Sequence, residues 1–298
     1  MALTPLFLLP LLSITIGLDP VAFALGGVEV HWYGVMYVVG IAIGAWVTER
    51  IAPRMGANVD ALWDLFPIAI FTGLMGGRLY FVVQDGVTDY LRTPGDIFAV
   101  WDGGMAFFGA IMAVVATIFV FARWRGLSPW PMFDAVSVFA VIGQVFGRIG
   151  NIVNGDVIGA ETSVPWGTAY THPDSFAPAF GVPYHPAAAY SMIANVLLLG
   201  VIYLAWRRYR YTGVPFATYL VGYSVTQFVI FFWRNNSITA FGLKQAQLTA
   251  IVIGLLGAAL LYWRLRERVP VVEGGEQPRS AAPPPTRAER RRRARRSR

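Results

Sequence analysis

The stretch "MFDAVSVFAVIGQVFGRIGNIVNGDVIG" occupies residues 132–159, and its mainly apolar first half is followed by a half that is rich in polar residues and glycine. Its first half is apolar apart from Asp134, Ser137 and Gln144, which is typical of a membrane-spanning helix. Its second half sets one arginine, two asparagines and one aspartate among glycines. The stretch therefore predicts a membrane helix that ends in a cluster of hydrogen-bonding side chains.

The composition of the whole chain agrees with a membrane protein. Of its 298 residues, 56% are hydrophobic and 14% are charged, whereas soluble domains carry about 25% charged residues. Half of the 24 basic residues but only 4 of the 17 acidic ones lie in residues 264–298, so the net charge of +7 belongs to a tail. We therefore expect no nucleic-acid-binding surface.

Seven apolar runs are long enough to cross a bilayer, and they predict an all-α, polytopic helical bundle. They cover residues 33–49, 64–84, 106–122, 131–147, 187–206, 215–233 and 246–263. The loops after the first, third and fifth runs are richer in arginine than the loops on the other side. The positive-inside rule then places the amino terminus outside and the carboxyl terminus in the cytoplasm.

The two ends of the chain differ from this body. Residues 5–18 are apolar but lack a preceding basic residue, so we interpret them as an amphipathic or partly inserted lead-in rather than a cleaved signal. Residues 1–263 are expected to form the membrane domain, and residues 264–298 a basic, Pro/Arg-rich disordered tail in the cytoplasm. This tail either binds anionic membrane lipids or only fixes the topology.

Three arginines are expected near the outer membrane boundary: Arg78, Arg148 and Arg234. A guanidinium group inside hydrocarbon costs at least about 2.5 kcal/mol, so three at one level suggest a shared anionic ligand. Guanidinium forks suit bidentate binding of phosphate, and a phospholipid headgroup supplies phosphate at this depth. The alternative is that each side chain simply snorkels to water.

Around Arg148 lie Asn151, Asn154 and Asp156, with Gly159 among the glycines that bracket them. The asparagines offer donors and acceptors together, and glycines let backbone N–H groups approach a ligand closely. Helix packing through small residues would explain the glycines but not the polar side chains. Tyr33, at the start of the first span, is either a further ligand or an ordinary interfacial aromatic.

These residues resemble the signature of the bacterial prolipoprotein diacylglyceryl transferase family, G-R-x-G/A-N-F-x-N-x-E-x-x-G, which stands here at residues 147–159. "DPVAFALGGVEVHWYGVMY", "GGRLYFVV", "WDGGMAFFGA" and "YHPAAAY" are similar to other family blocks, in the family's order. The resemblance covers residues 19–263 and implies seven spans with the amino terminus outside.

Several positions depart from the family pattern. Phe108 stands where the family has a histidine regarded as catalytically important, and Asp156 stands for the signature glutamate. Ile152, Ser191, Gln227 and Phe231 replace a phenylalanine, a glutamate, an arginine and a glutamate of the family. The chain is thus either a divergent enzyme or a paralogue that has lost the activity and binds lipid or lipoprotein precursors.

The resemblance implies transfer of a diacylglyceryl group from phosphatidylglycerol to the lipobox cysteine of a prolipoprotein signal peptide, in the bacterial plasma membrane. The chain itself has no cysteine, so the acceptor brings the thiol. Arg148 would hold the phosphate, with Arg234 as a second clamp and Arg78 as a further ligand. Asn151, Asn154 and Tyr33 would bind headgroup oxygens, and Asp156 would position Arg148.

The thiol must lose its proton, because the thiolate is the nucleophile. His185 and Asp156 are candidate bases, and the third alternative is an arginine field that lowers the thiol's pKa without a base. The "HP" at residues 185–186 could equally be a helix cap. No cofactor or metal is expected, since the chain has three histidines and no cysteine. A small transporter is a further alternative, disfavoured because the polar residues gather at one membrane face.

Overall fold

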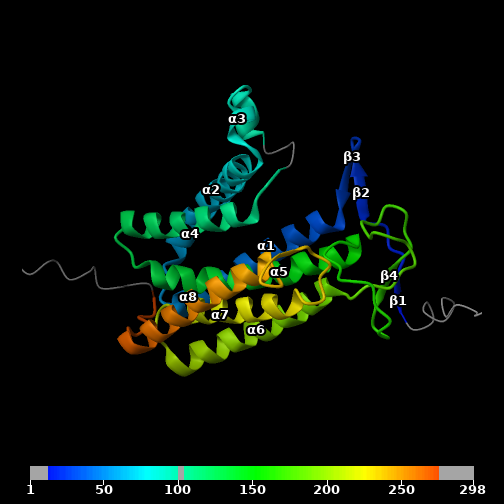
Figure 1. Ribbon diagram of the computed structural model, residues 1–298. Coiled ribbons are helices and arrows are strands. Elements are labelled where there is room, and N and C mark those ends of the chain that lie inside the picture. The colour runs from blue at the N-terminus through cyan, green and yellow to red at the C-terminus, as the bar shows by residue number, and fades with distance from the viewer. Residues whose placement is uncertain (1–12, 100–103, 275–298) are drawn as a thin grey trace, which may run out of the picture. The chain divides into compact units, whose positions relative to one another are not determined.

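The computed structural model describes residues 13–99 and 104–274, and it is mainly helical (Figure 1). The helices are α1 (Trp32–Ile51), α2 (Val59–Asp85), α3 (Val87–Tyr90), α4 (Phe107–Trp124), α5 (Pro129–Asn154), α6 (Ala187–Tyr209), α7 (Val214–Ile230) and α8 (Gln245–Glu267). Two 3-10 turns, Ala52–Met55 and Pro94–Phe98, accompany them.

The seven predicted spans correspond to α1, α2, α4, α5, α6, α7 and α8. Among the described residues, five helices are long and apolar enough to cross a membrane, and α4 and α7 contribute shorter apolar helices. The prediction of a polytopic, all-helical membrane protein is therefore confirmed.

Several helix ends lie a few residues away from the approximate bounds that were predicted. The fourth span was expected to end near residue 147, but α5 continues to Asn154. Its last two turns stay helical although they are polar, because Arg148 and Asn151 hydrogen-bond to each other along one helix face. The sixth span was expected to reach residue 233, whereas α7 ends at Ile230 and a turn follows.

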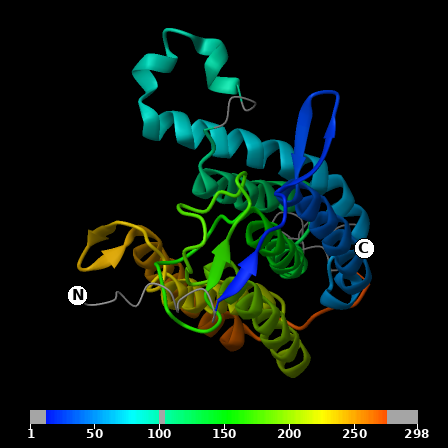
Figure 2. The same cartoon turned by 90° about the vertical axis from the view of Figure 1, so that its right-hand side faces the viewer.

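Short strands lie outside the helices: β1 (Ile14–Ile16), β2 (Val21–Leu25), β3 (Val28–His31), β4 (Thr168–Tyr170), β5 (Ile238–Ala240) and β6 (Leu243–Lys244). β1 pairs in parallel with β4, and β2–β3 and β5–β6 are antiparallel hairpins (Figure 2). Within residues 13–18 the expected lead-in is thus a strand, because its backbone groups find partners on β4. Residues 5–12 lie outside the described part of the chain.

The described residues form two compact units. The first unit contains residues 13–51 and 134–270, and the second contains residues 52–99, 104–133 and 271–274. Helix α5 begins in the second unit and carries most of its length in the first.

Helices of the first unit approach each other through glycines. A methyl group added at Gly222 of α7 would lie 2.3 Å from Leu198 Cδ1 of α6, and one added at Gly40 of α1 would lie 2.8 Å from Phe146 Cβ of α5. Small residues of this kind let membrane helices pack closely where no hydrophobic force drives them together. These contacts place α1 against α5 and α6 against α7.

At the end of the first unit where α7 begins and α8 ends, a buried carboxylate of α5 caps α7. Asp134 is 1% exposed and accepts hydrogen bonds from the backbone N–H groups of Gly213 (2.6 Å) and Phe216 (2.9 Å) at the start of α7. Arg264 of α8 donates to the carbonyl and hydroxyl oxygens of Thr212, both at 2.6 Å. This end is therefore a satisfied polar network that holds α5, α7 and α8 together.

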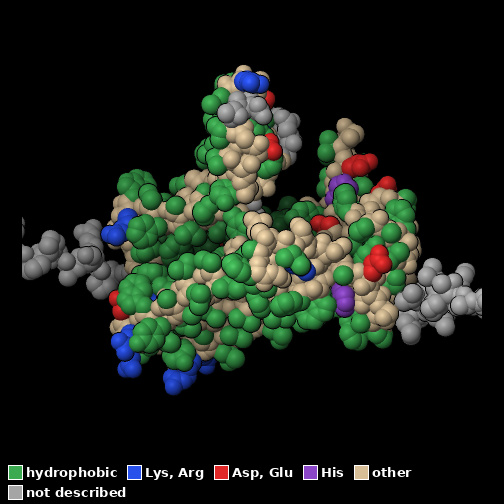
Figure 3. Space-filling model, in the orientation of Figure 1, with side chains coloured by type: hydrophobic (Ala, Val, Ile, Leu, Met, Phe, Trp, Pro, Cys, Tyr) green, Lys and Arg blue, Asp and Glu red, His purple; other side chains and the backbone are tan. Residues whose placement is uncertain are grey.

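The surface of the first unit follows the expectation for a membrane protein (Figure 3). Hydrophobic side chains cover the long sides of its helices, and basic side chains gather at the ends of α6 and α8 that lie away from the strands. Arg207 and Arg208 stand in the last turn of α6, and the exposed Arg266 stands in the last turn of α8. This distribution fits helices whose sides face lipid.

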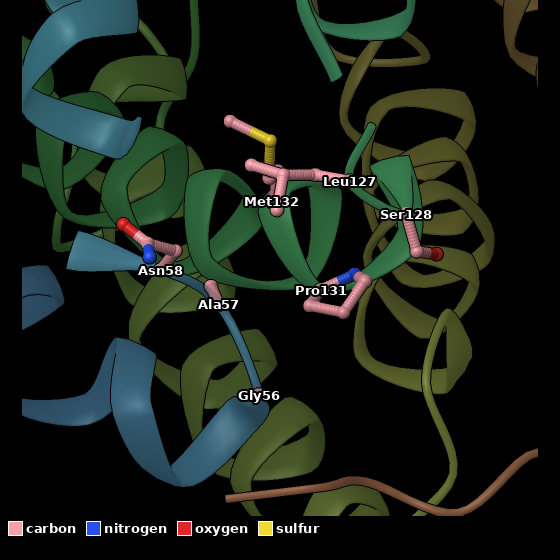
Figure 4. Close-up of a pocket in the computed structure, with 7 residues that line it drawn as sticks. All are labelled: Gly56, Ala57, Asn58, Leu127, Ser128, Pro131 and Met132. Atoms are coloured by element: carbon pink, nitrogen blue, oxygen red, sulfur yellow. The ribbon is translucent and has the colours of Figure 1, made fainter. Parts of the chain in front are cut away.

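In the second unit, α2 and α4 meet at Gly76 and Gly109, where added methyl groups would lie 2.7 Å and 2.4 Å from the facing backbone oxygens. The side chain of Asn58 caps α2 by accepting a hydrogen bond from Ala61 N (2.8 Å). A small hollow beside this cap is lined by Gly56, Ala57, Asn58, Leu127, Ser128, Pro131 and Met132 (Figure 4). No charged side chain lines this hollow.

Candidate active site

The last turns of α5 carry a short chain of hydrogen bonds. The Nη1 group of Arg148 donates to Asn151 Oδ1 (3.1 Å), and Asn151 Nδ2 donates to both carboxylate oxygens of Asp156 (3.1 and 2.9 Å). Asn151 is 4% exposed, so this geometry is fixed inside the protein. Asp156 thus acts on Arg148 through the asparagine amide.

A tight turn brings Asp156 back toward the helix that it follows. Gly155 has a φ of +77° and Val157 a φ of +56°, and the N–H groups of Gly155 and Asp156 both donate to Asn151 O. Glycine adopts this left-handed conformation at little cost. Burial raises the pKa of Asp156, while the Asn151 amide and the positive charges of Arg148 and Arg234 oppose that rise.

Asn154 lies deep in the same region. It is 4% exposed, and its Oδ1 atom is buried with no hydrogen-bond partner in the described part of the chain. Its backbone carbonyl accepts a hydrogen bond from Phe176 N (2.9 Å), which ties the long loop to the end of α5. A buried amide without a partner costs free energy, so this side chain is available for a ligand.

The backbone brings Arg234 to the signature. Gly159 and Arg234 form an isolated antiparallel bridge, Ala160 N donates to Trp233 O (2.7 Å), and Gly159 N donates to His185 O (2.8 Å). A methyl group at Gly159 would lie 2.5 Å from Trp233 O. Only glycine fits where these three segments meet.

The guanidinium groups of Arg148 and Arg234 influence each other. Burial and, next, the positive charge of Arg148 lower the pKa of Arg234, and Asp156 partly offsets this. The ammonium group of Lys244 lies behind Arg234, where it donates to the carbonyl oxygens of Phe231 (2.6 Å) and of Arg234 itself. Arg148 and Arg234 thus share one carboxylate, Asp156, and this excess of positive charge favours an anionic ligand.

Tyr33 lies against the signature helix. A methyl group at Gly150 would lie 2.7 Å from Tyr33 Cα, and one at Gly147 would lie 3.2 Å from Tyr37 Cε2. The Tyr33 hydroxyl donates to the Tyr37 hydroxyl at 3.0 Å. The start of α1 therefore adds two phenol groups beside Arg148.

His185 stands where the long loop enters α6. Its Nδ1 atom lies 3.1 Å from the hydroxyl of Tyr190, which also accepts a hydrogen bond from Trp166 Nε1 (2.8 Å). The rings of His185 and Trp233 are 6.3 Å apart, so the imidazole lies next to the segment that carries Arg234. Burial lowers the pKa of His185.

The comparisons with known proteins agree on one family. The family model described as "Prolipoprotein diacylglyceryl transferase" matches residues 20–263. A phosphatidylglycerol–prolipoprotein diacylglyceryl transferase of Chromohalobacter salexigens is 34% identical, over 85% of this chain and 94% of its own length. The proteins of the same name from Legionella pneumophila strain Paris and Geobacter sulfurreducens are each 32% identical, over 84% and 85% of this chain and 98% and 97% of their own lengths.

The chain belongs to the prolipoprotein diacylglyceryl transferase family. The motifs in the sequence therefore indicated the right family, and the geometry above describes how this member arranges its signature.

Arg78 occupies a different setting in this transferase-family chain. It belongs to the second unit, is 4% exposed, and donates to the backbone oxygens of Asp96 (2.6 Å), Gly104 (3.2 Å) and Ile97 (3.4 Å). Its guanidinium group thus secures the segment between α3 and α4. Its role as a substrate ligand stays a prediction.

The positions that depart from the family pattern have their own partners. Ser191 is buried and donates to Ala187 O of its own helix (2.9 Å). The Phe231 ring lies 5.3 Å from the guanidinium carbon of Arg234. Gln227 keeps a buried Nε2 group that has no partner among the described residues. Phe108 lies in the first turn of α4, in the second unit.

Several polar neighbours of the signature were missed from the sequence. Tyr223 of α7 interacts with the side chain of Arg148, and Gln144 of α5 donates to the Tyr219 hydroxyl at 2.9 Å. Tyr219 and Tyr223 are one helical turn apart within an apolar span. This i, i+4 spacing of hydroxyl groups was the signal that could have found them.

One group of side chains has the spacing of a metal site. The ligand atoms of Asp19, His172 and Asp174 lie within 4.8 Å of one another. Both aspartates are exposed, and Asp19 already accepts a hydrogen bond from Val21 N (2.8 Å). Exposed acidic groups often lie this close without an ion, so no role is assigned to them.

Proposed function

We propose that this chain transfers the diacylglyceryl group of phosphatidylglycerol to the lipobox cysteine thiol of prolipoproteins, which is the first step of lipoprotein maturation. Membership of the family supports this reaction. The observation that carries the assignment to particular residues is that the signature ties Arg148 to Asp156 through Asn151 and pairs with Arg234 through Gly159.

The reaction forms one carbon–sulfur bond and breaks one carbon–oxygen bond. The cysteine sulfur attacks the diacylglyceryl carbon that is esterified to phosphate, and the bonding electrons pass to the phosphate oxygen. Glycerol phosphate leaves. Arg148 and Arg234 bind the phosphodiester and stabilise the negative charge that grows on the leaving group; removing one such preorganised donor typically costs about 10²–10³ in rate.

The neighbouring polar groups orient the lipid. Asp156 holds Arg148 through Asn151, so the guanidinium plane is set before the lipid binds. Asn154 offers its unpartnered amide oxygen as an acceptor to a hydroxyl group of the lipid headgroup, and Tyr33 contributes a hydroxyl from the start of α1. Arg78 is proposed as a further anion ligand, and Gly159 as the position that lets the signature loop approach Arg234.

The proton of the thiol passes to a base or to solvent as the sulfur attacks. Asp156 and His185 are the candidate bases in the first unit. Because two guanidinium groups stabilise a nearby thiolate, the acceptor's thiol is also more acidic here than in water.

The chain is a multi-pass membrane protein, and we place it in the bacterial cytoplasmic membrane with its amino terminus outside. Residues 1–263 are proposed as the transferase domain, with the signature near the outer surface. The basic residues of 264–298 are proposed to lie on the anionic inner leaflet, at about 1 kcal/mol per residue near the surface. Residues 275–298 of this tail lie outside the described part of the chain.

A second candidate function is lipid or lipoprotein-precursor binding without transfer. Phe108 in place of the family histidine favours it, and so does Gln227 in place of an arginine, since its amide keeps an unpartnered nitrogen. Both changes remove side chains that carry charge or protons in the family pattern.

A complementation experiment separates these candidates. Cells depleted of their own transferase receive the wild-type chain, Phe108→His or Arg148→Ala. Growth and thioether-modified lipoprotein with the wild-type chain support the transferase, with Arg148→Ala inactive. If Phe108→His alone sustains growth, the chain is a transferase-like binder whose chemistry has been lost.

A further inference from the structure

A hydrogen-bond chain of three aromatic side chains ends at His185. The indole N–H of Trp166 donates to the Tyr190 hydroxyl oxygen at 2.8 Å, and that hydroxyl lies 3.1 Å from His185 Nδ1. The Tyr190 ring also packs edge-on against Trp233, at a centroid distance of 5.9 Å. The phenol is thus held from both sides.

The donors and acceptors of this chain favour one arrangement of the protons. An indole nitrogen can only donate, so the Tyr190 oxygen accepts from Trp166. The single O–H of Tyr190 then has His185 Nδ1 as its one acceptor in the described part of the chain. Nδ1 therefore serves as the acceptor, and a neutral imidazole places its proton on Nε2.

The Nε2 group is left free for a ligand. His185 makes its one side-chain hydrogen bond through Nδ1, and Nε2 is not among the buried polar atoms that lack a partner, so it remains accessible. The backbone of His185 is hydrogen-bonded to Gly159 and Ala160. The same two residues pair through their backbones with Trp233 and Arg234. The imidazole thus lies on a segment whose backbone is tied to the one that carries Arg234, with its ring centroid 6.3 Å from that of Trp233.

We propose that Trp166 and Tyr190 are positioning residues that hold His185 as the Nε2–H tautomer, so that His185 donates a hydrogen bond to the anionic lipid headgroup and does not act as the base for the thiol. This role rests on the proposed function, because it assigns His185 to the phospholipid of that reaction. A base at Nε2 needs an unprotonated nitrogen there, and the Tyr190 hydrogen bond opposes that tautomer. The thiol proton then goes to Asp156 or to solvent.

The tautomer can be measured directly, without any activity. The chain has three histidines, so ¹⁵N-histidine labelling in proteoliposomes gives few signals, and His185→Asn identifies the one of interest. We expect protonated Nε2 and unprotonated Nδ1 in the wild type near neutral pH, and a loss of this preference in Tyr190→Phe. Protonated Nδ1 in the wild type, or an unchanged ratio in Tyr190→Phe, overturns the proposal.

Two substitutions separate a donor from a base. The amide nitrogen of glutamine reaches the place of Nε2 and donates, but it does not take a proton. His185→Ala should lower thioether formation about tenfold to a hundredfold, as expected when a hydrogen bond to a charged group is lost. His185→Gln should recover most of that rate, with the acid limb of its pH profile unchanged. His172→Gln is the matched control in the same loop.

If His185→Gln is as slow as His185→Ala, or if it loses the acid limb, His185 is the base. The failure of the proposed function has a different signature, because then the wild type forms no thioether at all. In that case the tautomer is still measured, and the His185 Nε2–H signal is compared between proteoliposomes of phosphatidylglycerol with phosphatidylcholine and of phosphatidylcholine alone. A shift that depends on phosphatidylglycerol supports headgroup binding, and identical spectra overturn it.

Discussion

Gly159 and Arg234 face each other as an antiparallel bridge pair, so the last glycine of the signature is a backbone neighbour of the arginine that follows α7. This crossing has no room for a side chain, since a methyl group at Gly159 would lie 2.5 Å from Trp233 O and 2.7 Å from His185 Cβ. The position of Arg234 relative to Arg148 therefore depends on a residue that has no side chain.

Gly159→Ala should lower thioether formation about tenfold or more, because the clash displaces the segment that carries Arg234. The control is Gly200→Ala in α6, where an added methyl group meets no atom within 4 Å. Rates of both variants are compared in detergent at equal amounts of folded protein. Equal rates for the two alanine variants would show that the close backbone contact at Gly159 does not determine the position of Arg234 in the active site.

Arg148→Ala should reduce the rate about 10²–10³-fold while the protein still inserts in the membrane, because a preorganised donor to the leaving phosphate is lost. Arg148→Lys should recover little of this, since an ammonium group cannot form the bidentate contact or replace the bond to Asn151. The assay follows thioether formation on a lipobox peptide in phosphatidylglycerol vesicles. Near wild-type turnover by Arg148→Ala would remove Arg148 from the mechanism.

Because burial raises the pKa of Asp156, we expect pH to have opposite effects on stability and on activity. Burial raises the pKa of this carboxyl group, so the folded protein binds a proton that the unfolded chain has already lost. The stability contributed by that proton is present at low pH and is lost as pH rises through the raised pKa. Activity should change the other way, since ionised Asp156 accepts both hydrogen bonds that set Asn151 and, through it, Arg148.

Asp156→Asn should therefore unfold at a higher temperature than the wild type at neutral pH and transfer lipid more slowly. The unfolding temperature of the variant should also lose the dependence on pH that the wild type shows between acidic and neutral pH. Thermal unfolding in detergent between acidic and neutral pH tests this. A variant with a lower unfolding temperature than the wild type at neutral pH would contradict the burial argument.

At the other end of the first unit, Asp134→Ala should lower the free energy of unfolding by about 1–3 kcal/mol, because the N–H groups of Gly213 and Phe216 lose their acceptor. Ser137→Ala is the control, since Ser137 Oγ bonds only to the carbonyl of Asp134 in its own helix (2.7 Å). The rate per folded molecule should not change in either variant. Equal stability of the two variants would show that the cap contributes nothing.

Most of the fold could be predicted from hydrophobic runs alone. Seven apolar segments correspond to seven helices, because a lipid-facing helix must be apolar over most of its length. The ends of α5 and α7 were misplaced for the same reason: the prediction stopped or continued with hydrophobicity, while hydrogen bonds decide where a helix ends. Arg148 and Asn151 keep α5 helical, and the turn after Ile230 ends α7.

The candidate site was predicted only in part. The signature gave Arg148, Asn151 and Asp156 as a local group, since all three lie within nine consecutive residues at the end of α5. The contacts of Tyr223, Lys244 and Tyr190 come from packing between segments that are far apart in sequence, and no local pattern encodes it. Arg78 shows what the sequence does not distinguish. An arginine within an apolar run looks the same in the sequence whether its guanidinium group binds a ligand or, as here, backbone carbonyl oxygens.

The parallel pairing of β1 with β4 has a consequence for biosynthesis. β1 precedes α1 and β4 follows α5, so four crossing helices separate them. An even number of crossings returns the chain to the compartment where it started, as the pairing requires. During translation β1 has no strand to pair with until residues 168–170 have been synthesised, and the amino-terminal segment and the signature loop therefore reach their final form together.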